Sequence, residues 1–193
     1  MPSRQLEAFL SARGYRVAPV TIDNDEYIFA QAYDRASVRG DRDTMRRVAA
    51  AYVPYMDAKL AFFERNSMEL FGREIRQILL VHANMLNADE FDRLAQTIEH
   101  RGYRFITLER ALEDPALQSA DTYIGPAGIT WLQRWALTNK MPKSFFQGEP
   151  EVPLLWRIML DRSACGHAGT QARQRAACTA SASGGGAPRE IKK

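Results

Sequence analysis

The chain has 193 residues, 46% of them hydrophobic, which is enough for one folded domain with a core. Residues 162–193 contain six basic residues and one acidic residue, a net charge of +5, so the total of +3 leaves −2 for residues 1–161. Because no basic face with interleaved aromatic residues precedes the basic tail, we expect no nucleic-acid binding. No apolar run is long enough to span a bilayer, so we expect no membrane span.

The first half of the chain alternates predicted helices and strands. A helix is expected from about Ser3 to Arg13, where apolar residues recur at helical spacing. The β-branched residues of 15–23 predict a strand. Helical periodicity then extends from about Asp43 to Phe71, with a kink expected at Pro54. The continuous apolar run over 76–83 is typical of a strand buried on both faces of a parallel sheet.

The second half continues this alternation. Asn87 and Glu90 have the spacing of a capping box and predict the start of a helix. A strand is expected at 103–108, and Thr107 is expected to cap the short helix after it. A further helix is expected around Trp131. Alternating helices and strands predict βαβ units, and therefore an α/β fold with a parallel sheet or barrel.

The composition changes abruptly near residue 160. Residues 161–193 are basic, rich in Ala, Gly and Ser, and free of aromatic residues. Such a segment cannot bury enough apolar surface to offset its ordering entropy, so we expect a disordered tail after a folded part at 1–160. Cys165, His167 and Cys178 lie in this tail, but their spacing matches no structural zinc site and a fourth ligand is lacking.

Polar side chains follow two of the predicted strands. Asp23, Asp25 and Glu26 come after the first, and His82 and Asn84 come at the end of the second. Because a long helical connection joins these strands, we expect them to be parallel and their polar ends to share one edge. A histidine beside carboxylates there would form an acid–base pair. The structural alternatives are a histidine that only makes hydrogen bonds and acids that only cap the next helix.

Three segments of the chain match one known family in order and spacing. They read APVTIDNDEYIFAQAYDRA, ILLVHANMLNADEFDRL and HRGYRFITLERALEDP, and an ending TYIGPAGITWLQRWAL follows them. Over residues 3–155 the chain resembles the C-terminal half of bacterial NodB-homology polysaccharide deacetylases. The resemblance implies an α/β fold, namely the last three or four strands of a distorted (β/α) barrel with covering helices. Residues 1–160 would then be the C-terminal part of the catalytic domain.

The family's chemistry assigns roles to several residues of the second predicted strand. Its members remove acetyl groups from N-acetylated glycans with a divalent metal, usually zinc, held by an aspartate and two histidines. A histidine on a late strand then protonates the leaving amine, and His82 matches it. Leu80 matches the leucine that packs against the acetyl methyl group. The resemblance therefore implies His82 as the proton donor and Leu80, Tyr27 and Asn84 as substrate contacts.

The partner of this histidine is less closely specified. In the family an aspartate followed by tryptophan orients the histidine, whereas this chain has glutamate followed by tyrosine at 26–27. Either Glu26 takes the role with its longer side chain, or Asp23 or Asp25 does. We predict Asp23 together with Glu26, which gives His82, Asp23 and Glu26 as the catalytic residues.

The family motifs that supply the base and the metal ligands are not found. The threonine–phenylalanine–aspartate–aspartate run, the two-histidine motif and the arginine–proline–glycine segment are absent, and His100 fits a structural role at a helix end. We therefore predict a truncated deacetylase that binds no metal alone, is inactive alone, and self-associates through an open sheet edge. Localisation is unspecified by this chain, although the resemblance implies a periplasmic or secreted full-length protein.

An alternative from a different class is a non-catalytic glycan-binding or interaction module derived from the same fold. Trp131, Trp135, Tyr123 and Tyr27 would then offer faces on which sugars stack. Aromatic residues at helical spacing are more often part of the core, which favours the enzyme interpretation.

Overall fold

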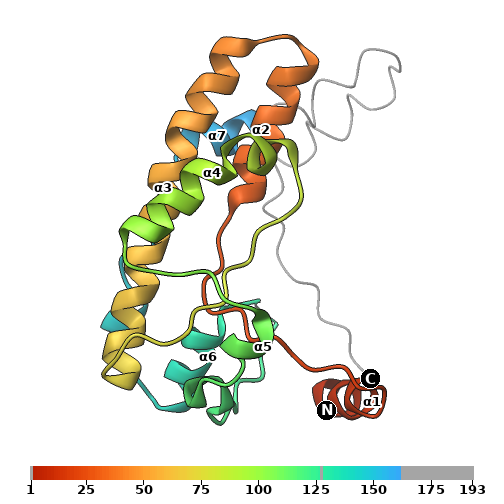
Figure 1. Ribbon diagram of the computed structural model, residues 1–193, viewed down its shortest axis with the longest axis vertical. Helices are drawn as coiled ribbons and strands as arrows, with labels where there is room; N and C mark the ends of the chain where they lie inside the picture. The colour runs from red at the N-terminus through yellow and green to blue at the C-terminus, as the bar shows by residue number, and fades with distance from the viewer. Residues whose placement is uncertain (1, 127, 162–193) are drawn as a thin grey trace, which may run out of the picture.

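The computed structural model describes residues 2–126 and 128–161, and this part of the chain is mostly helical (Figure 1). The strand pairing within it is limited to one isolated parallel bridge between Ile22 and Leu79. The helices are α1 (Pro2–Ser11), α2 (Glu26–Val38), α3 (Arg42–Phe71), α4 (Met85–His100), α5 (Leu108–Ala111), α6 (Trp131–Thr138) and α7 (Leu154–Asp161), with 3-10 helices η1 (Pro115–Gln118) and η2 (Lys143–Phe146).

This architecture corrects the predicted fold class. The sequence predicts the last strands of a distorted (β/α) barrel, but the described residues contain no sheet and no barrel. The runs 15–23, 76–83 and 103–108 are irregular, apart from the two bridge residues and Leu108, which begins α5. The open sheet edge predicted as a surface for self-association is therefore not formed in this part of the chain.

The bridge shows why the strand predictions are wrong. Leu80 N donates to Ile22 O at 3.1 Å, and Thr21 N and Ile22 N both donate to Ile78 O. Beyond these bonds, side chains replace a backbone partner: the Thr21 hydroxyl accepts from Ile78 N at 2.7 Å, and Glu26 accepts from His82 N. The apolar runs therefore meet side by side without forming a ladder, a distinction that an apolar pattern does not encode.

Several helix predictions are confirmed, because local capping determines the ends of these helices. Asp41 accepts a hydrogen bond from Thr44 N at the start of α3, and Gly72 ends the helix with a φ of 68°, a conformation that favours glycine. α3 runs through Pro54 without interruption. Thr107 caps α5 as predicted. The predicted start of α4 is wrong by about one turn, because its N-cap is Asn84 and not Asn87.

The helix α2 is missing from the sequence prediction. The acids at 23–26 are expected either at the polar end of a strand or as caps of a following helix, and no element is predicted between them and Asp43. In the structure Glu26 is its first residue, and Ile28, Phe29, Ala32 and Tyr33 are buried on it. Burial of this face against the neighbouring helices stabilises a helix that has no side-chain cap at Asp25.

The core forms around α3, which runs along the length of the molecule (Figure 1). α2 and α4 pack on α3, α7 packs on α2, and α6 also contacts α3. The Phe29 ring lies 5.1 Å from that of Tyr55 and 6.4 Å from that of Trp156, which joins α2, α3 and α7. Phe71 and Trp135 join α3 to α6, with ring centroids 5.8 Å apart.

Two further predictions concern the C-terminal tail and membrane-spanning helices. The tail predicted at 161–193 lies outside the described residues, except for Asp161 at the end of α7. Within residues 2–126 and 128–161, no helix combines the length and the apolar character that a bilayer crossing requires. α1 lies to one side of the helical body in Figure 1.

The capping box of α6 allows a direct test of local helix stability. Thr130 accepts from Gln133 N at 3.2 Å, and Gln133 Oε1 accepts from Thr130 N at 3.1 Å. We expect Thr130→Ala to lower the free energy of unfolding in urea by about 1 kcal/mol. Thr130→Ser keeps the hydroxyl and serves as the matched control. Equal loss in both variants would show that the methyl group, and not the cap, stabilises this position.

Candidate functional site

A glutamate and a histidine meet beside the parallel bridge. The bridge between Ile22 and Leu79 sets the two following stretches side by side, so that Glu26 at the start of α2 faces the chain that leads into α4. Oε1 of Glu26 lies 2.8 Å from Nδ1 of His82 and accepts a hydrogen bond from its backbone N at 2.8 Å. The structure thus brings together the predicted histidine and one of the three candidate acids.

Two asparagines from the start of α4 also donate to Glu26. Oε1 accepts from Asn84 Nδ2 at 3.4 Å and from Asn87 Nδ2 at 3.3 Å. Asn87 Nδ2 also donates to His82 O at 2.8 Å, while its Oδ1 accepts from the Tyr52 hydroxyl. Burial, together with the nearby charge of Glu26, raises the pKa of Tyr52, so its hydroxyl remains a donor. The network holds both the carboxylate and the backbone of His82.

Burial distinguishes the two members of the pair. The Glu26 side chain is 1% exposed, whereas the His82 side chain is 59% exposed. A carboxylate can only accept hydrogen bonds, so Nδ1 of His82 carries the proton that lies between them. Nε2 has no hydrogen-bond partner among the described residues. The buried acid therefore orients a ring whose other nitrogen can exchange a proton with a bound molecule.

The other two acids of the cluster lie apart from this pair. Asp23 Oδ1 accepts from Asn24 N at 2.8 Å, and Asp25 N donates to the Tyr55 hydroxyl at 3.0 Å. Neither carboxylate is hydrogen bonded or ion paired to His82 in the structure. Of the acids left open by the sequence, Glu26 is the one that contacts the histidine.

The three residues predicted to contact substrate differ in whether their side chains already bind other residues of the chain. Asn84 is the N-cap of α4: its Oδ1 accepts from Asn87 N at 2.8 Å and its Nδ2 donates to Glu26. Leu80 is 37% exposed and Tyr27 is 48% exposed, so both present apolar surface beside the pair. Asn84 therefore acts on the local structure, while Leu80 and Tyr27 remain accessible to a ligand.

Sequence reasoning misses two residues of the network. Asn87 is predicted as the helix cap, but it lies inside α4 and is buried, with its amide between Glu26 and His82. Tyr52 fits the apolar stripe of α3, and nothing in that pattern shows where its hydroxyl points. The available signal is the type of residue at 87, since a buried asparagine is nearly always hydrogen bonded.

The residues present do not fit a metal site. Within the part of the chain that the structure describes, no three His, Cys, Asp or Glu side chains come together in a group that could hold a metal ion. The pair offers one imidazole and one carboxylate, whereas a catalytic zinc usually needs three protein ligands. We therefore derive no step of the chemistry through a metal bound by these residues.

The aromatic residues of the alternative interpretation are largely covered. Trp135 is fully buried. The Arg134 guanidinium lies 4.5 Å from the ring centroid of Trp131 and 5.4 Å from that of Tyr123, so it occupies a stacking position on both rings. Tyr27 alone among the four is half exposed. These contacts do not favour a glycan-binding module built on aromatic stacking.

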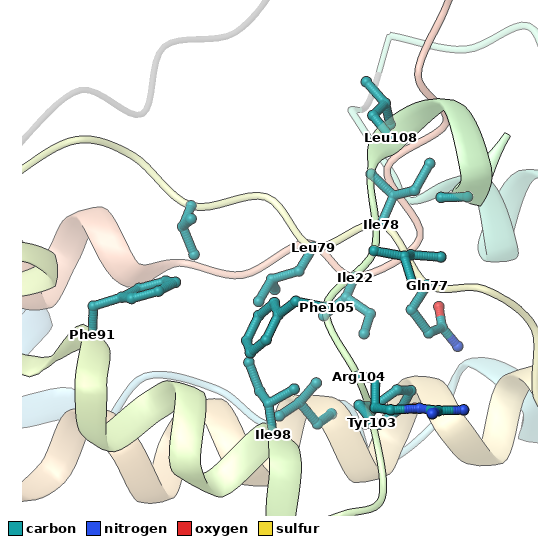
Figure 2. A pocket seen from close by; sticks show the side chains of 14 residues that line it. Ile22, Gln77, Ile78, Leu79, Phe91, Ile98, Tyr103, Arg104, Phe105 and Leu108 are labelled. Atoms are coloured by element: carbon teal, nitrogen blue, oxygen red, sulfur yellow. The ribbon is translucent and has the colours of Figure 1, made fainter.

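An apolar cavity of about 280 Å³ lies beside the bridge (Figure 2). Ile22 and Leu79 line it from the bridge, and Phe91, Ile98 and Phe105 line it from α4 and the chain after it. Its lining includes Val81 but stops short of His82. Neither Glu26 nor His82 lines the cavity, so it is separate from the acid–base pair.

No protein family, curated protein or solved structure matches this chain. No relative thus assigns a role to Glu26 or His82. Function is therefore inferred from the chemistry of this pair.

Proposed function

We propose that this chain supplies the proton donor of a polysaccharide deacetylase, a hydrolase that acts on the N-acetyl amide of N-acetylated glycans. One observation carries the proposal: Nδ1 of the exposed His82 ring lies 2.8 Å from the buried Oε1 of Glu26. The position of His82 in a segment that resembles the family supports it.

The chemistry of amide hydrolysis explains why such a pair is useful. An amine leaves poorly unless its nitrogen is protonated as the C–N bond breaks. A protonated imidazole can give its Nε2 proton to that nitrogen, while a carboxylate behind Nδ1 keeps the ring oriented and stabilises its positive charge. Glu26 provides this carboxylate, and its burial keeps the interaction strong.

Exposed apolar side chains beside the pair would contact the substrate. Leu80 precedes His82 by two residues and is 37% exposed. Its exposed side chain would pack against the acetyl methyl group. Tyr27, next to Glu26, would contact the sugar ring.

We expect the purified chain, supplied with zinc or cobalt, to release no acetate from an N-acetylglucosamine oligomer above the buffer rate. The reason is that the described residues lack a three-ligand metal group, and the polarisation of the carbonyl that the metal supplies in this family must come from elsewhere. Acetate release that His82→Ala abolishes would contradict the predicted inactivity while supporting the role of His82.

Glycan recognition is tested by protection of the histidine ring. We expect an N-acetylglucosamine trimer to slow modification of His82 by diethyl pyrocarbonate, read by mass spectrometry of peptides. His100, exposed at the end of α4, is the internal control and should react at an unchanged rate. The glucosamine trimer, which lacks the acetyl groups, should protect less. Equal reaction of His82 with and without the acetylated trimer would overturn the proposed function.

A further inference from the structure

A groove of about 900 Å³ lies at the end of the 76–82 segment that is remote from His82. Its walls are formed by the last turns of α3, by residues 74–77, and by the end of α4 with the chain that follows it, residues 100–104. The helix α5 lies on one side. None of the residues that line it belongs to the hydrogen-bond network of Glu26 and His82. The groove is therefore a separate site from the acid–base pair.

Basic side chains outnumber acidic ones in the lining of this groove. Residues 1–161 carry a net charge of −2, so a basic groove has the opposite sign of charge to this part of the chain as a whole. Its basic residues are Arg76, His100, Arg101, Arg104 and Arg110.

The two acids that line the groove are already engaged. Glu64 accepts from both Nε and Nη2 of Arg101, which neutralises that arginine. Glu74 accepts from Gln77 Nε2 at 2.6 Å and from the Tyr103 hydroxyl at 2.8 Å. Glu64 is therefore paired with Arg101, and neither Glu64 nor Glu74 is hydrogen bonded or ion paired to Arg76, Arg104 or Arg110 in the part of the chain that the structure describes.

Among the arginines that line the groove, Arg104 and Arg110 differ from the others in their lack of side-chain partners among residues 2–126 and 128–161. Both are exposed, and neither guanidinium makes a hydrogen bond or an ion pair within the described residues. Figure 2 shows the Arg104 side chain pointing away from Phe105. Two free guanidiniums on one groove provide ten N–H donors that a water-exposed anion can use.

The backbone around these arginines is anchored. Nη1 of Arg76 donates to Arg110 O, and Arg110 N donates to the Thr107 hydroxyl at 3.3 Å. Tyr103, next to Arg104, is held by its bond to Glu74. Anchored positions with free side-chain ends reduce the entropy lost on binding.

We infer that this groove binds a phosphate-type anion, either free phosphate or a phosphate monoester, between Arg104 and Arg110. The planar guanidinium matches two phosphate oxygens at once and forms the stronger, charge-assisted hydrogen bonds. The claim does not depend on the proposed deacetylase chemistry, because it uses none of the same residues.

The test is a calorimetric and NMR titration of the full chain with inorganic phosphate and, separately, with methyl phosphate, both at constant ionic strength. We expect saturable binding with a dissociation constant of roughly 1 mM or tighter, and shifts of the Arg104 and Arg110 Nε–Hε resonances. Arg104→Gln and Arg110→Gln should each weaken binding about tenfold. Tighter binding of methyl phosphate would identify a monoester as the ligand, and equal or tighter binding of inorganic phosphate would identify the free anion.

The matched control is Arg46→Gln, since Arg46 is an exposed arginine on α3 that pairs with Asp43 outside the groove. This variant should bind as the unmodified chain does. Both glutamine variants alter exposed side chains, and unchanged thermal unfolding would show that they fold. The inference is overturned if neither anion binds, or if Arg104→Gln and Arg110→Gln bind as tightly as Arg46→Gln.

Discussion

Replacing Glu26 with alanine is expected to lower the free energy of unfolding by about 3 kcal/mol. Glu26 is 1% exposed, and its Oε1 accepts from the backbone and ring of His82 and from the amides of Asn84 and Asn87. Removal of the carboxylate leaves these groups without their shared acceptor. It also opens a cavity next to the core. Urea unfolding followed by circular dichroism measures the change.

Two variants show whether the effect belongs to this carboxylate. Glu26→Gln keeps one acceptor oxygen, so it should lose less stability than the alanine variant. Asp23→Ala removes a half-buried neighbouring carboxylate whose bond is to the next backbone amide, and it should cost within about 1 kcal/mol. A loss for Glu26→Ala no greater than that for Asp23→Ala would contradict the buried network.

Replacing Asp114 with alanine is expected to cost about 3 kcal/mol. Its side chain is 4% exposed and pairs with Arg73, and it accepts from Arg76 N and from Ala116 N, both at 2.9 Å. These bonds hold the start of the 76–82 segment against η1. Without the carboxylate, two backbone amides and a guanidinium lose their partner, which the same urea experiment would measure.

The stabilisation by Asp114 is expected to depend on pH. The hydrogen bond from Arg73, with those from the amides of Arg76 and Ala116, lowers the pKa of Asp114 to about 2. A lowered pKa stabilises the fold above the unfolded value of about 4, and this stability is lost as the pH falls towards 2. Because Arg73 is half exposed, we expect the loss to be about 2 kcal/mol.

Asp114→Asn should therefore lose less stability than the unmodified chain between about pH 4 and pH 2, since it has no carboxylate to protonate. Asp43→Asn, at an exposed aspartate of α3, is the control and should keep the original pH dependence. The same slope in Asp114→Asn and in the unmodified chain would show that other groups cause the acid sensitivity.

The sequence predicts the helices whose ends are determined locally. Gly72 and Thr107 act through neighbours in the chain, so their types and spacing are sufficient to locate the end of α3 and the start of α5. The strands fail because a sheet depends on partners distant in sequence. The apolar runs around Ile22 and Leu79 meet in parallel as expected, but they form one bridge and no ladder.

The residue types of the candidate site can be predicted from the sequence, but the acid that lies beside His82 cannot. A long helical connection correctly suggests that the stretch after Ile22 lies beside the stretch after Leu79, which brings an acid to His82. Whether that acid is Asp23, Asp25 or Glu26 depends on where α2 begins, and in the structure Glu26, the first residue of α2, contacts His82. The supporting role of Asn87 depends on tertiary packing, and its residue type is the one local signal for it.

The most direct test is long-range ¹⁵N NMR of the His82 ring, recorded during titration with an N-acetylglucosamine trimer. Orientation by Glu26 predicts that the neutral ring carries its proton on Nδ1, and that the trimer shifts the Nε2 resonance of His82 but not that of His100. Glu26→Gln should weaken the preference for the Nδ1 proton. A neutral ring protonated on Nε2, with resonances that do not respond to the trimer, would contradict His82 as a proton donor for glycan deacetylation.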